Sequence, residues 1–134
     1  MKKKAFTLIE LLIVIAIIGL LATLSVIALN NARAKSRDAK RVADVKQMQT
    51  ALELFFNDAQ RYPTTNEIAT SPTIAYGSNV YMSIIPTPPT PPAAHVEYTY
   101  TSNDINTYTL QYFLEGPVGS IPEGLNTATN SSLR

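Results

Sequence analysis

The sequence has no cysteine and only one histidine among its 134 residues. Without cysteine these residues form no disulfide, no thiol nucleophile, no cysteine-ligated metal site and no lipoprotein anchor. With a single histidine, a site that needs two or more imidazole side chains is excluded for these residues. The sequence also lacks a glycine-rich phosphate loop, a pair of catalytic carboxylates and a nucleophile with a matching base. We therefore expect no enzyme, no metal and no cofactor.

Charge is scarce as well, and its largest gap lies near the N-terminus. Charged residues make up 16% of the chain, against about 25% in soluble domains. None occurs among the 22 positions between Glu10 and Arg33. As a helix this gap would extend about 33 Å, which matches the roughly 30 Å hydrocarbon core of a bilayer. The stretch Phe6–Leu29 is apolar on all sides, which predicts burial in lipid or in an assembly.

The charge that is present is segregated along the chain. Residues 1–32 carry +2, residues 33–46 carry +4 and residues 47–134 carry −5, within a total of +1. The middle segment contains a basic patch of Arg33, Lys35, Arg37, Lys40 and Arg41. Its three arginines follow one another at four-residue spacing, where like charges destabilise a helix, so they predict anionic partners. The simpler alternative is a solvated helix face assisted by the two aspartates of the segment.

The pattern after Asn31 predicts that the apolar helix continues as an amphipathic one. No proline or glycine occurs between residues 32 and 62. Apolar residues recur there at three- and four-residue steps, at Val42, Val45, Met48, Leu52, Phe55 and Phe56. We expect one helix from about Thr7 to Ala59, ended by Tyr62-Pro63 because a residue before proline is driven out of helical conformation. The apolar stripe is the predicted core of a small head.

The head is predicted to be a small antiparallel sheet. We expect a strand at Val80–Ile85 and a proline-rich loop at Pro86–Pro92. Alternating apolar residues in Val96–Tyr100 and Tyr108–Leu114 predict a hairpin with one buried face, and Gly116–Arg134 is expected to be irregular.

About 70 residues without a disulfide form only a marginal core of their own, so the sheet should pack on the C-terminal half of the helix. The fold class is thus α+β, with one long N-terminal helix and a small β head. The expected parts are a leader at 1–5, an apolar helix at 6–31, its amphipathic continuation at 32–60 and the head at 61–134.

The segment from Lys2 to Ala22, KKKAFTLIELLIVIAIIGLLA, resembles the N-terminus of type IV pilins and of the pseudopilins of type II secretion and competence systems. The resemblance implies cleavage between Ala5 and Phe6 by a prepilin peptidase and N-methylation of Phe6. It also implies that identical subunits form a helical filament with the help of a pilus or secretion assembly machinery. Before assembly the chain would span the bacterial cytoplasmic membrane once; afterwards it would be part of a surface pilus or a periplasmic pseudopilus.

Glu10 gives this resemblance a physical basis. A lone carboxylate at full membrane depth costs about 2.5 to 3.5 kcal/mol on insertion scales. An opposite charge at about 4 Å, at an effective dielectric constant near 20, offsets this with about 4 kcal/mol of attraction. Cleavage before Phe6 creates an α-amino group that can supply the charge, and the resemblance places that amine on a neighbouring subunit. Glu10 is therefore the predicted assembly salt bridge, and the alternative is a carboxylate that simply reaches interfacial water.

Three features do not follow the family pattern. Ala5 stands where most members have glycine, although alanine is the mildest replacement. The stretch Gly19–Ile27 lacks the proline that kinks many pilin helices. Counting positive charges on the two sides of the apolar stretch favours the reverse membrane orientation, and here the motif outweighs the count.

Other functions stay open at this point. The N-terminus could be an ordinary signal peptide cleaved after Ala34, but the apolar run is longer than usual and begins with Glu10. The chain could be a single-pass anchored binding protein that never polymerises. It could also be a minor pilin that binds DNA through Arg37 and Arg41. Membrane lipid, acids of a neighbouring head and DNA are thus the three candidate partners of the basic patch.

Overall fold

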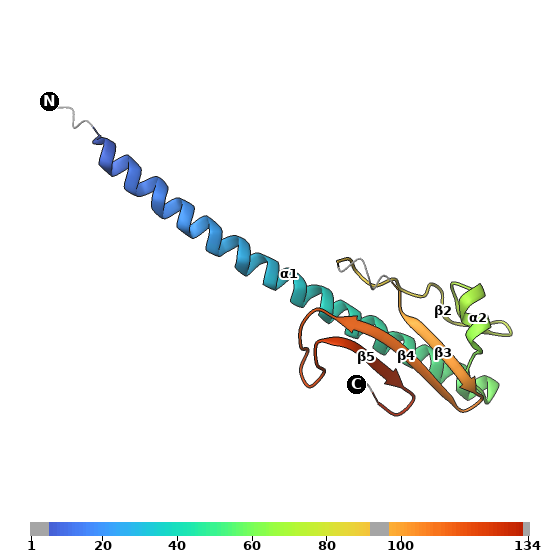
Figure 1. Cartoon of the computed structure of the whole chain (residues 1–134). Coiled ribbons are helices and arrows are strands. Elements are labelled where there is room, and N and C mark those ends of the chain that lie inside the picture. Colours follow the sequence, from blue (N-terminus) through green and yellow to red (C-terminus); the bar gives the residue numbers. More distant parts are fainter. Residues whose placement is uncertain (1–5, 92–96, 133–134) are drawn as a thin grey trace. The chain divides into compact units, whose positions relative to one another are not determined.

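The computed structural model describes residues 6–91 and 97–132. The predicted leader, with Ala5, and Val96 of the predicted hairpin lie outside the described residues. The elements in chain order are α1 (Leu8–Ala59), α2 (Thr65–Thr70), β1 (Ile74–Tyr76), β2 (Asn79–Met82), β3 (Thr99–Asp104), β4 (Thr107–Leu114) and β5 (Gly124–Thr129). The predicted α+β class is confirmed (Figure 1).

The chain divides into two compact units, residues 1–33 and 34–134, and α1 contributes residues to both. In the first unit every residue from Phe6 to Arg33 is exposed. By length and composition α1 is suited to cross a membrane, and within the described ranges no other helix is. The predicted helix from Thr7 to Ala59 is confirmed to within one residue.

The core of the second unit lies between α1 and the sheet formed by β3, β4 and β5. The apolar stripe of α1 supplies Val45, Met48, Leu52 and Phe55, all almost completely buried. Strand β4 alternates strictly between exposed and buried positions, and its buried side chains from Tyr108 to Leu114 belong to the same cluster. Figure 1 shows the three strands beside the C-terminal part of α1. The predicted packing of the sheet on this part of the helix is therefore confirmed.

Strand order in the larger sheet is β3-β4-β5, with both pairings antiparallel. Strands β3 and β4 form the predicted hairpin, with Tyr100 opposite Leu110. Strand β5 pairs with β4 over six residues, from Leu114 opposite Gly124 to Thr109 opposite Thr129. The expectation that residues 116–134 are irregular was therefore wrong for Gly124–Thr129, and residues 133–134 lie outside the described ones.

The sequence of β5 hides the strand because its inward positions are not large apolar residues. They are Asn126 and Ala128, both almost fully buried. The side-chain amide of Asn126 donates to the carbonyl oxygens of Pro122 at 3.0 Å and Gly124 at 2.9 Å. The free edge of β4, rather than an alternating apolar pattern, therefore determines that this segment is extended.

Two further elements differ from expectation. The strand expected at Val80–Ile85 is β2, which ends at Met82 and pairs with β1, a strand that was not predicted. Helix α2 lies in the stretch that was expected to consist of turns. It begins with a capping box, in which Thr64 and Glu67 each bind the other's backbone N–H group, so two donors at its N-terminus are satisfied.

Leu52 and Leu54 provide a matched pair for testing which face of α1 carries the head. Leu52 is 0% exposed and Leu54 is 49% exposed. We expect Leu52→Ala to lower the free energy of unfolding by about 2 to 5 kcal/mol, because it leaves a cavity in the core. Leu54→Ala should change it by less than about 0.5 kcal/mol. Urea titration of the full chain in detergent micelles, followed by tyrosine fluorescence, measures both values, and equal losses would contradict the assigned face.

Candidate functional site

The first candidate site is the beginning of α1, where Thr7 and Glu10 form a capping box. The Glu10 carboxylate oxygen Oε2 accepts the backbone N–H of Thr7 at 2.8 Å and the Thr7 hydroxyl at 2.6 Å. In return the backbone N–H of Glu10 donates to Thr7 Oγ1 at 3.3 Å. These bonds satisfy donors that have no partner within the helix.

The carboxylate of Glu10 therefore has a role within a single chain. Both hydrogen bonds from Thr7 reach the same oxygen, Oε2, and Oε1 has no partner among the described residues. A carboxylate has about four acceptor positions, so capping leaves room for a further donor. The structure thus adds a local helix cap to the role predicted from the sequence, and it leaves one oxygen available for a charged partner.

The two polar side chains farther along the apolar stretch bind their own helix. Thr23 donates from its hydroxyl to the carbonyl of Leu20 at 2.7 Å, and Ser25 donates to that of Leu21 at 2.8 Å. Bonds of this type satisfy a hydroxyl without any partner from outside the helix. From Leu11 to Leu29, α1 therefore presents an almost wholly apolar surface, suited to lipid or to other apolar helices.

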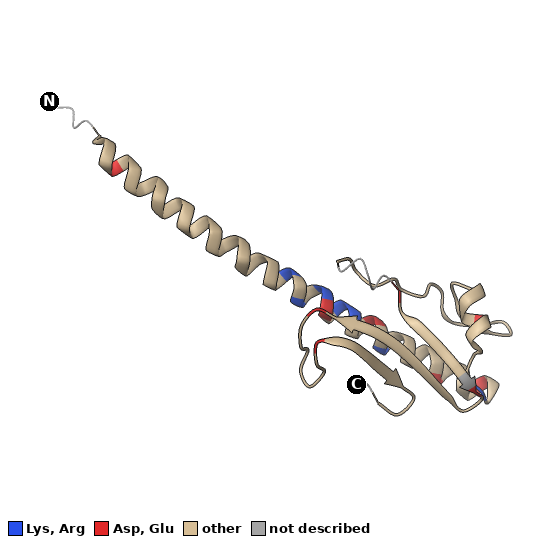
Figure 2. Cartoon of the chain, viewed as in Figure 1, with Lys and Arg blue, Asp and Glu red and all other residues tan. Residues whose placement is uncertain are grey.

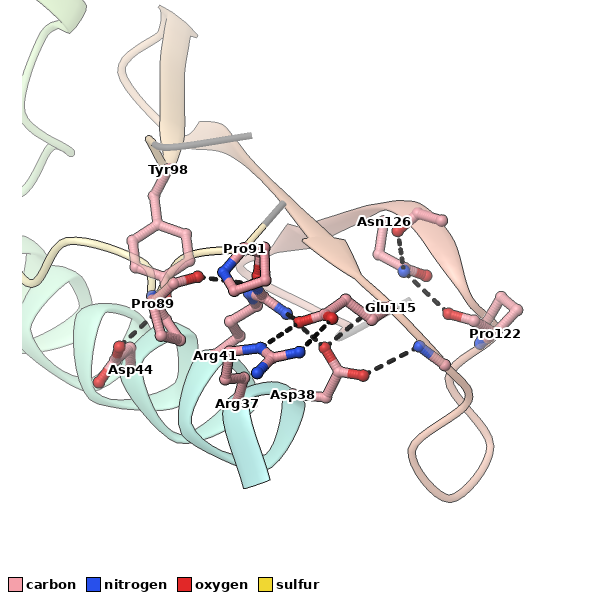
Figure 3. A network of polar contacts seen from close by, with 12 residues as sticks. Arg37, Asp38, Arg41, Asp44, Pro89, Pro91, Tyr98, Glu115, Pro122 and Asn126 are labelled. Atoms are coloured by element: carbon pink, nitrogen blue, oxygen red, sulfur yellow. Dashed lines mark hydrogen bonds and ion pairs between the residues drawn. The ribbon is translucent and has the colours of Figure 1, made fainter. Parts of the chain in front are cut away.

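The second candidate site is the predicted basic patch, and the structure divides its members into two groups. Arg41 is buried, with only 1% of its side chain exposed. Its guanidinium donates to Asp38 Oδ1 at 2.6 Å and to Glu115 Oε1 at 2.7 Å. The other terminal nitrogen donates to the backbone carbonyls of Pro89 at 2.6 Å and Pro91 at 2.5 Å (Figure 3). One side chain thus joins α1, the proline-rich segment and the loop after β4.

Arg37 and Asp38 complete this network. Arg37 grips Glu115 with two hydrogen bonds, from Nε at 2.7 Å and from Nη2 at 2.6 Å. Asp38 accepts the backbone N–H groups of Glu115 and Gly116, both at 2.9 Å. We call Arg37, Asp38, Arg41 and Glu115 the ion-pair network. Its two positive and two negative charges cancel, so charged groups that would be costly to bury alone are compensated.

The network shifts the acid–base equilibria of its members. Hydrogen bonds from Arg37 above all, and from Arg41, lower the pKa of Glu115 to about 2. The same contact with Glu115 raises the pKa of Arg37 further above its ordinary value. Next to the network, Tyr98 donates to the buried Asp44 at 3.0 Å. Burial and the Asp44 carboxylate raise the pKa of Tyr98 above its ordinary value.

The remaining members of the basic patch, Arg33, Lys35 and Lys40, are exposed. None of them takes part in an ion pair with another described residue. The sequence did not indicate that Glu115, Pro89 and Pro91 would meet Arg37 and Arg41, because this contact depends on how the sheet is placed along the helix. No group of three or more potential metal-ligating side chains was found in the two described ranges.

Comparison with known proteins places these features in a wider context. Residues 1–26 match the family model described as the prokaryotic N-terminal methylation motif. The chain is 36% identical over 97 residues to type II secretion system core protein G of Escherichia coli (strain K12), which covers 66% of this chain and 67% of that protein. The corresponding protein of Pectobacterium carotovorum subsp. carotovorum is 32% identical over 97 residues, covering 66% of this chain and 62% of the relative.

A type IV pilin is also among the relatives. The chain is 38% identical over 72 residues to the type IV major pilin protein PilA of Myxococcus xanthus (strain DK1622), which covers 53% of this chain and 33% of that pilin. The chain therefore spans between one third and two thirds of the length of these three relatives. No solved structure matches it significantly.

Arg41 and its neighbour Lys40 allow a direct test of the ion-pair network. We expect Arg41→Met to lower the free energy of unfolding by about 3 to 5 kcal/mol, because Asp38 would stay buried without its positive partner. Lys40→Met removes the same charge from an exposed position and should change the free energy by less than about 0.5 kcal/mol. Urea titration of the full chain in micelles measures both. A loss below about 1 kcal/mol for Arg41→Met would show that the network does not hold the head together.

Glu115 predicts the acid sensitivity of the head. Its pKa is about 2 in the folded chain and 4.5 in an ordinary environment. Between pH 2 and pH 4.5, Glu115 is therefore largely protonated in the unfolded chain and largely ionised in the folded chain. Stability conferred by Glu115 is therefore complete above about pH 4.5 and is lost as the pH falls toward about 2. Thermal unfolding of Glu115→Gln should show a shallower decline over this range, whereas the exposed Glu123→Gln should keep the original slope. An unchanged slope in Glu115→Gln would contradict the pairing.

Proposed function

The chain belongs to the family of type IV pilins and type II secretion pseudopilins, and we propose that it is anchored in the membrane as a prepilin and then assembles with identical copies into an envelope filament. The observation that carries this proposal is the exposed apolar surface of α1 from Leu11 to Leu29, which has no partner within the described chain. A bilayer covers that surface before assembly, and the helices of neighbouring copies cover it afterwards. The family match over residues 1–26 and the relatives support the same function.

Processing is the first step that this function requires. We place the cleavage between Ala5 and Phe6 and the methyl group on the new Phe6 amine, as the matching motif supports. Cleavage removes Lys2, Lys3 and Lys4, so the positive charge that remains at this end of α1 is the amine itself. A prepilin peptidase and an envelope assembly machinery are therefore the partners in processing and assembly.

Glu10 is the group to which the Phe6 amine of a neighbouring copy would bind. The carboxylate is held in place by Thr7 through Oε2, and Oε1 has no partner among the described residues. An ion pair in an apolar environment removes the cost of an isolated charge at that depth. The pair would fix how far one α1 is displaced along the next, because few other polar groups lie on this part of the helix.

The basic patch is a less favourable DNA site than its sequence indicated. Arg37 and Arg41, the two arginines on which that hypothesis relied, each contact Glu115. Phosphate would have to compete with Glu115 and Asp38, two carboxylates that together neutralise both guanidinium groups. Membrane lipid and neighbouring subunits remain the partners that we assign to the exposed cations.

Among filaments of this family, a secretion pseudopilus is the more specific candidate. The Escherichia coli core protein G is matched over 67% of its length, whereas the Myxococcus xanthus pilin is matched over 33%. The aligned segment is also longer for the secretion protein, at 97 residues against 72 for the pilin. We therefore propose the pseudopilus first and the surface pilus second.

Glu10→Gln separates the two roles of this side chain. Glutamine at this position still completes a capping box, but it cannot form an ion pair with an amine. We expect Glu10→Gln to insert normally into the membrane and to lose most of its incorporation into filaments. Thr7→Ala is the matched control, since it removes the cap and keeps the charge, so it should still be incorporated. Quantitative immunoblotting of membrane and sheared filament fractions measures both steps.

The same fractions test processing directly. Mass spectrometry of the N-terminal peptide should find a methylated Phe6 in the wild-type chain. For the Glu10→Gln experiment above, normal filaments from the variant would refute the ion pair. An intact Met1, or a terminus after Ala34, would refute prepilin processing and favour an anchored or exported head.

A further inference from the structure

In the part of α1 that begins the second unit, the acidic side chains are buried and the lysine side chains are exposed. Between Ala34 and Lys46 the two acids, Asp38 and Asp44, are buried, at 2% and 7% exposure. The exposed charged residues of this stretch are Lys35, Lys40 and Lys46. Its outer surface therefore carries positive charge alone, and Figure 2 shows the basic residues gathered on this length of α1.

Among the described residues these lysines form no ion pair with the two aspartates of the stretch, which have other partners. Asp38 binds Arg41 and two backbone N–H groups, and Asp44 accepts the hydroxyl of Tyr98. Glu115, the acid from the adjacent loop, binds both arginines. The ion-pair network is thus neutral as a whole, and the positive charge of the exposed lysines stays uncompensated by it.

The sequence places this positive surface immediately after the apolar stretch. Arg33 follows 22 uncharged residues, and Lys35 comes two positions later. In a membrane-anchored chain such positions lie at the level of the lipid headgroups, where each lysine or arginine is attracted to an anionic surface. Both side chains are long enough to extend toward phosphate groups while their methylene groups stay near the apolar layer.

We propose that Arg33 and Lys35 bind the phosphate groups of anionic phospholipids while the subunit is in the membrane. This rests on the proposed membrane-anchored state, and it identifies the lipid partner as one that carries net negative charge. Arg37 and Arg41 take no part, since their charges are cancelled by the ion-pair network. Lys46 takes no part either: it lies eleven residues after Lys35, about 16 Å farther along α1, which is about two Debye lengths at physiological salt.

Lipid selectivity of the full chain in vesicles tests the proposal. The chain is reconstituted in phosphatidylcholine, and spin-labelled phosphatidylglycerol and spin-labelled phosphatidylcholine are compared for their fraction bound at the protein surface. The wild-type chain should prefer phosphatidylglycerol, and Lys35→Gln should reduce this preference by up to about five-fold. Lys46→Gln is the matched control, with the same charge removed from an exposed position of the same helix, and it should retain the preference. High salt should abolish the preference.

Two results would overturn the proposal. One is a wild-type chain that does not discriminate between the two lipids, and the other is an equal loss in Lys35→Gln and Lys46→Gln. Unchanged selectivity in Lys35→Gln together with fewer filaments would assign this lysine to an acid on a neighbouring subunit instead. Failure of the lipid proposal can be distinguished from failure of the proposed filament function, because Glu10→Gln should lose filaments and keep its lipid selectivity.

Discussion

The exposed apolar surface of α1 is the constraint on which the other features of this chain depend. From Leu11 to Ala32 the helix offers neither a charged residue nor a buried face. Exposure of such a surface to water costs free energy in proportion to its area. A stable state of the chain must therefore cover it with another apolar surface. Two partners satisfy the requirement, lipid and other copies of the same helix, and the proposed function uses both in succession. The three hydroxyl groups of this unit follow the same constraint, because Thr7, Thr23 and Ser25 all donate to groups of α1.

In the second unit one face of α1 is buried in the core, in contrast to the first unit, where all its residues are exposed. The helical period allows residues three and four apart to share that face, which places Asp38, Arg41 and Val45 on the inside together. The buried charges of Asp38 and Arg41 are tolerated because each has a partner of opposite sign at hydrogen-bond distance. Charges on the outer face have no such partner in the segment. The +4 of residues 33–46 is therefore not one uniform patch but a neutral inner group and a positive outer one.

The sequence was sufficient for the features that depend on local periodicity. The bounds of α1, the core positions of its apolar stripe and the β3-β4 hairpin follow from spacing that a single segment contains. Strand β5 was missed because its inward residues, Asn126 and Ala128, carry no apolar alternation and the strand depends on the edge of β4. The contact of Arg41 with Glu115 was missed for a related reason: the two are 74 positions apart, and nothing local determines how a sheet is placed along a helix.

Capping was a local signal that the sequence did contain. Thr7 and Glu10 at the start of α1 repeat the spacing of Thr64 and Glu67 at the start of α2, and both pairs form reciprocal capping boxes. Recognising the pattern would have predicted α2, and it would also have given Glu10 a role that does not require a neighbour.

The cap at Glu10 bears on the proposed membrane-anchored state, which comes before assembly. Without it, a carboxylate at the edge of the apolar stretch would be an unpaired charge until a neighbour arrived, so membrane insertion itself would carry the cost. With Thr7 as donor, part of the carboxylate's hydrogen-bonding capacity is satisfied in a single chain. In the proposed assembly, the prepilin is then a stable species in the membrane, and the positive amine would bind a carboxylate whose position is already fixed. Preorganisation of this kind favours association because the acceptor loses little conformational freedom when its partner binds.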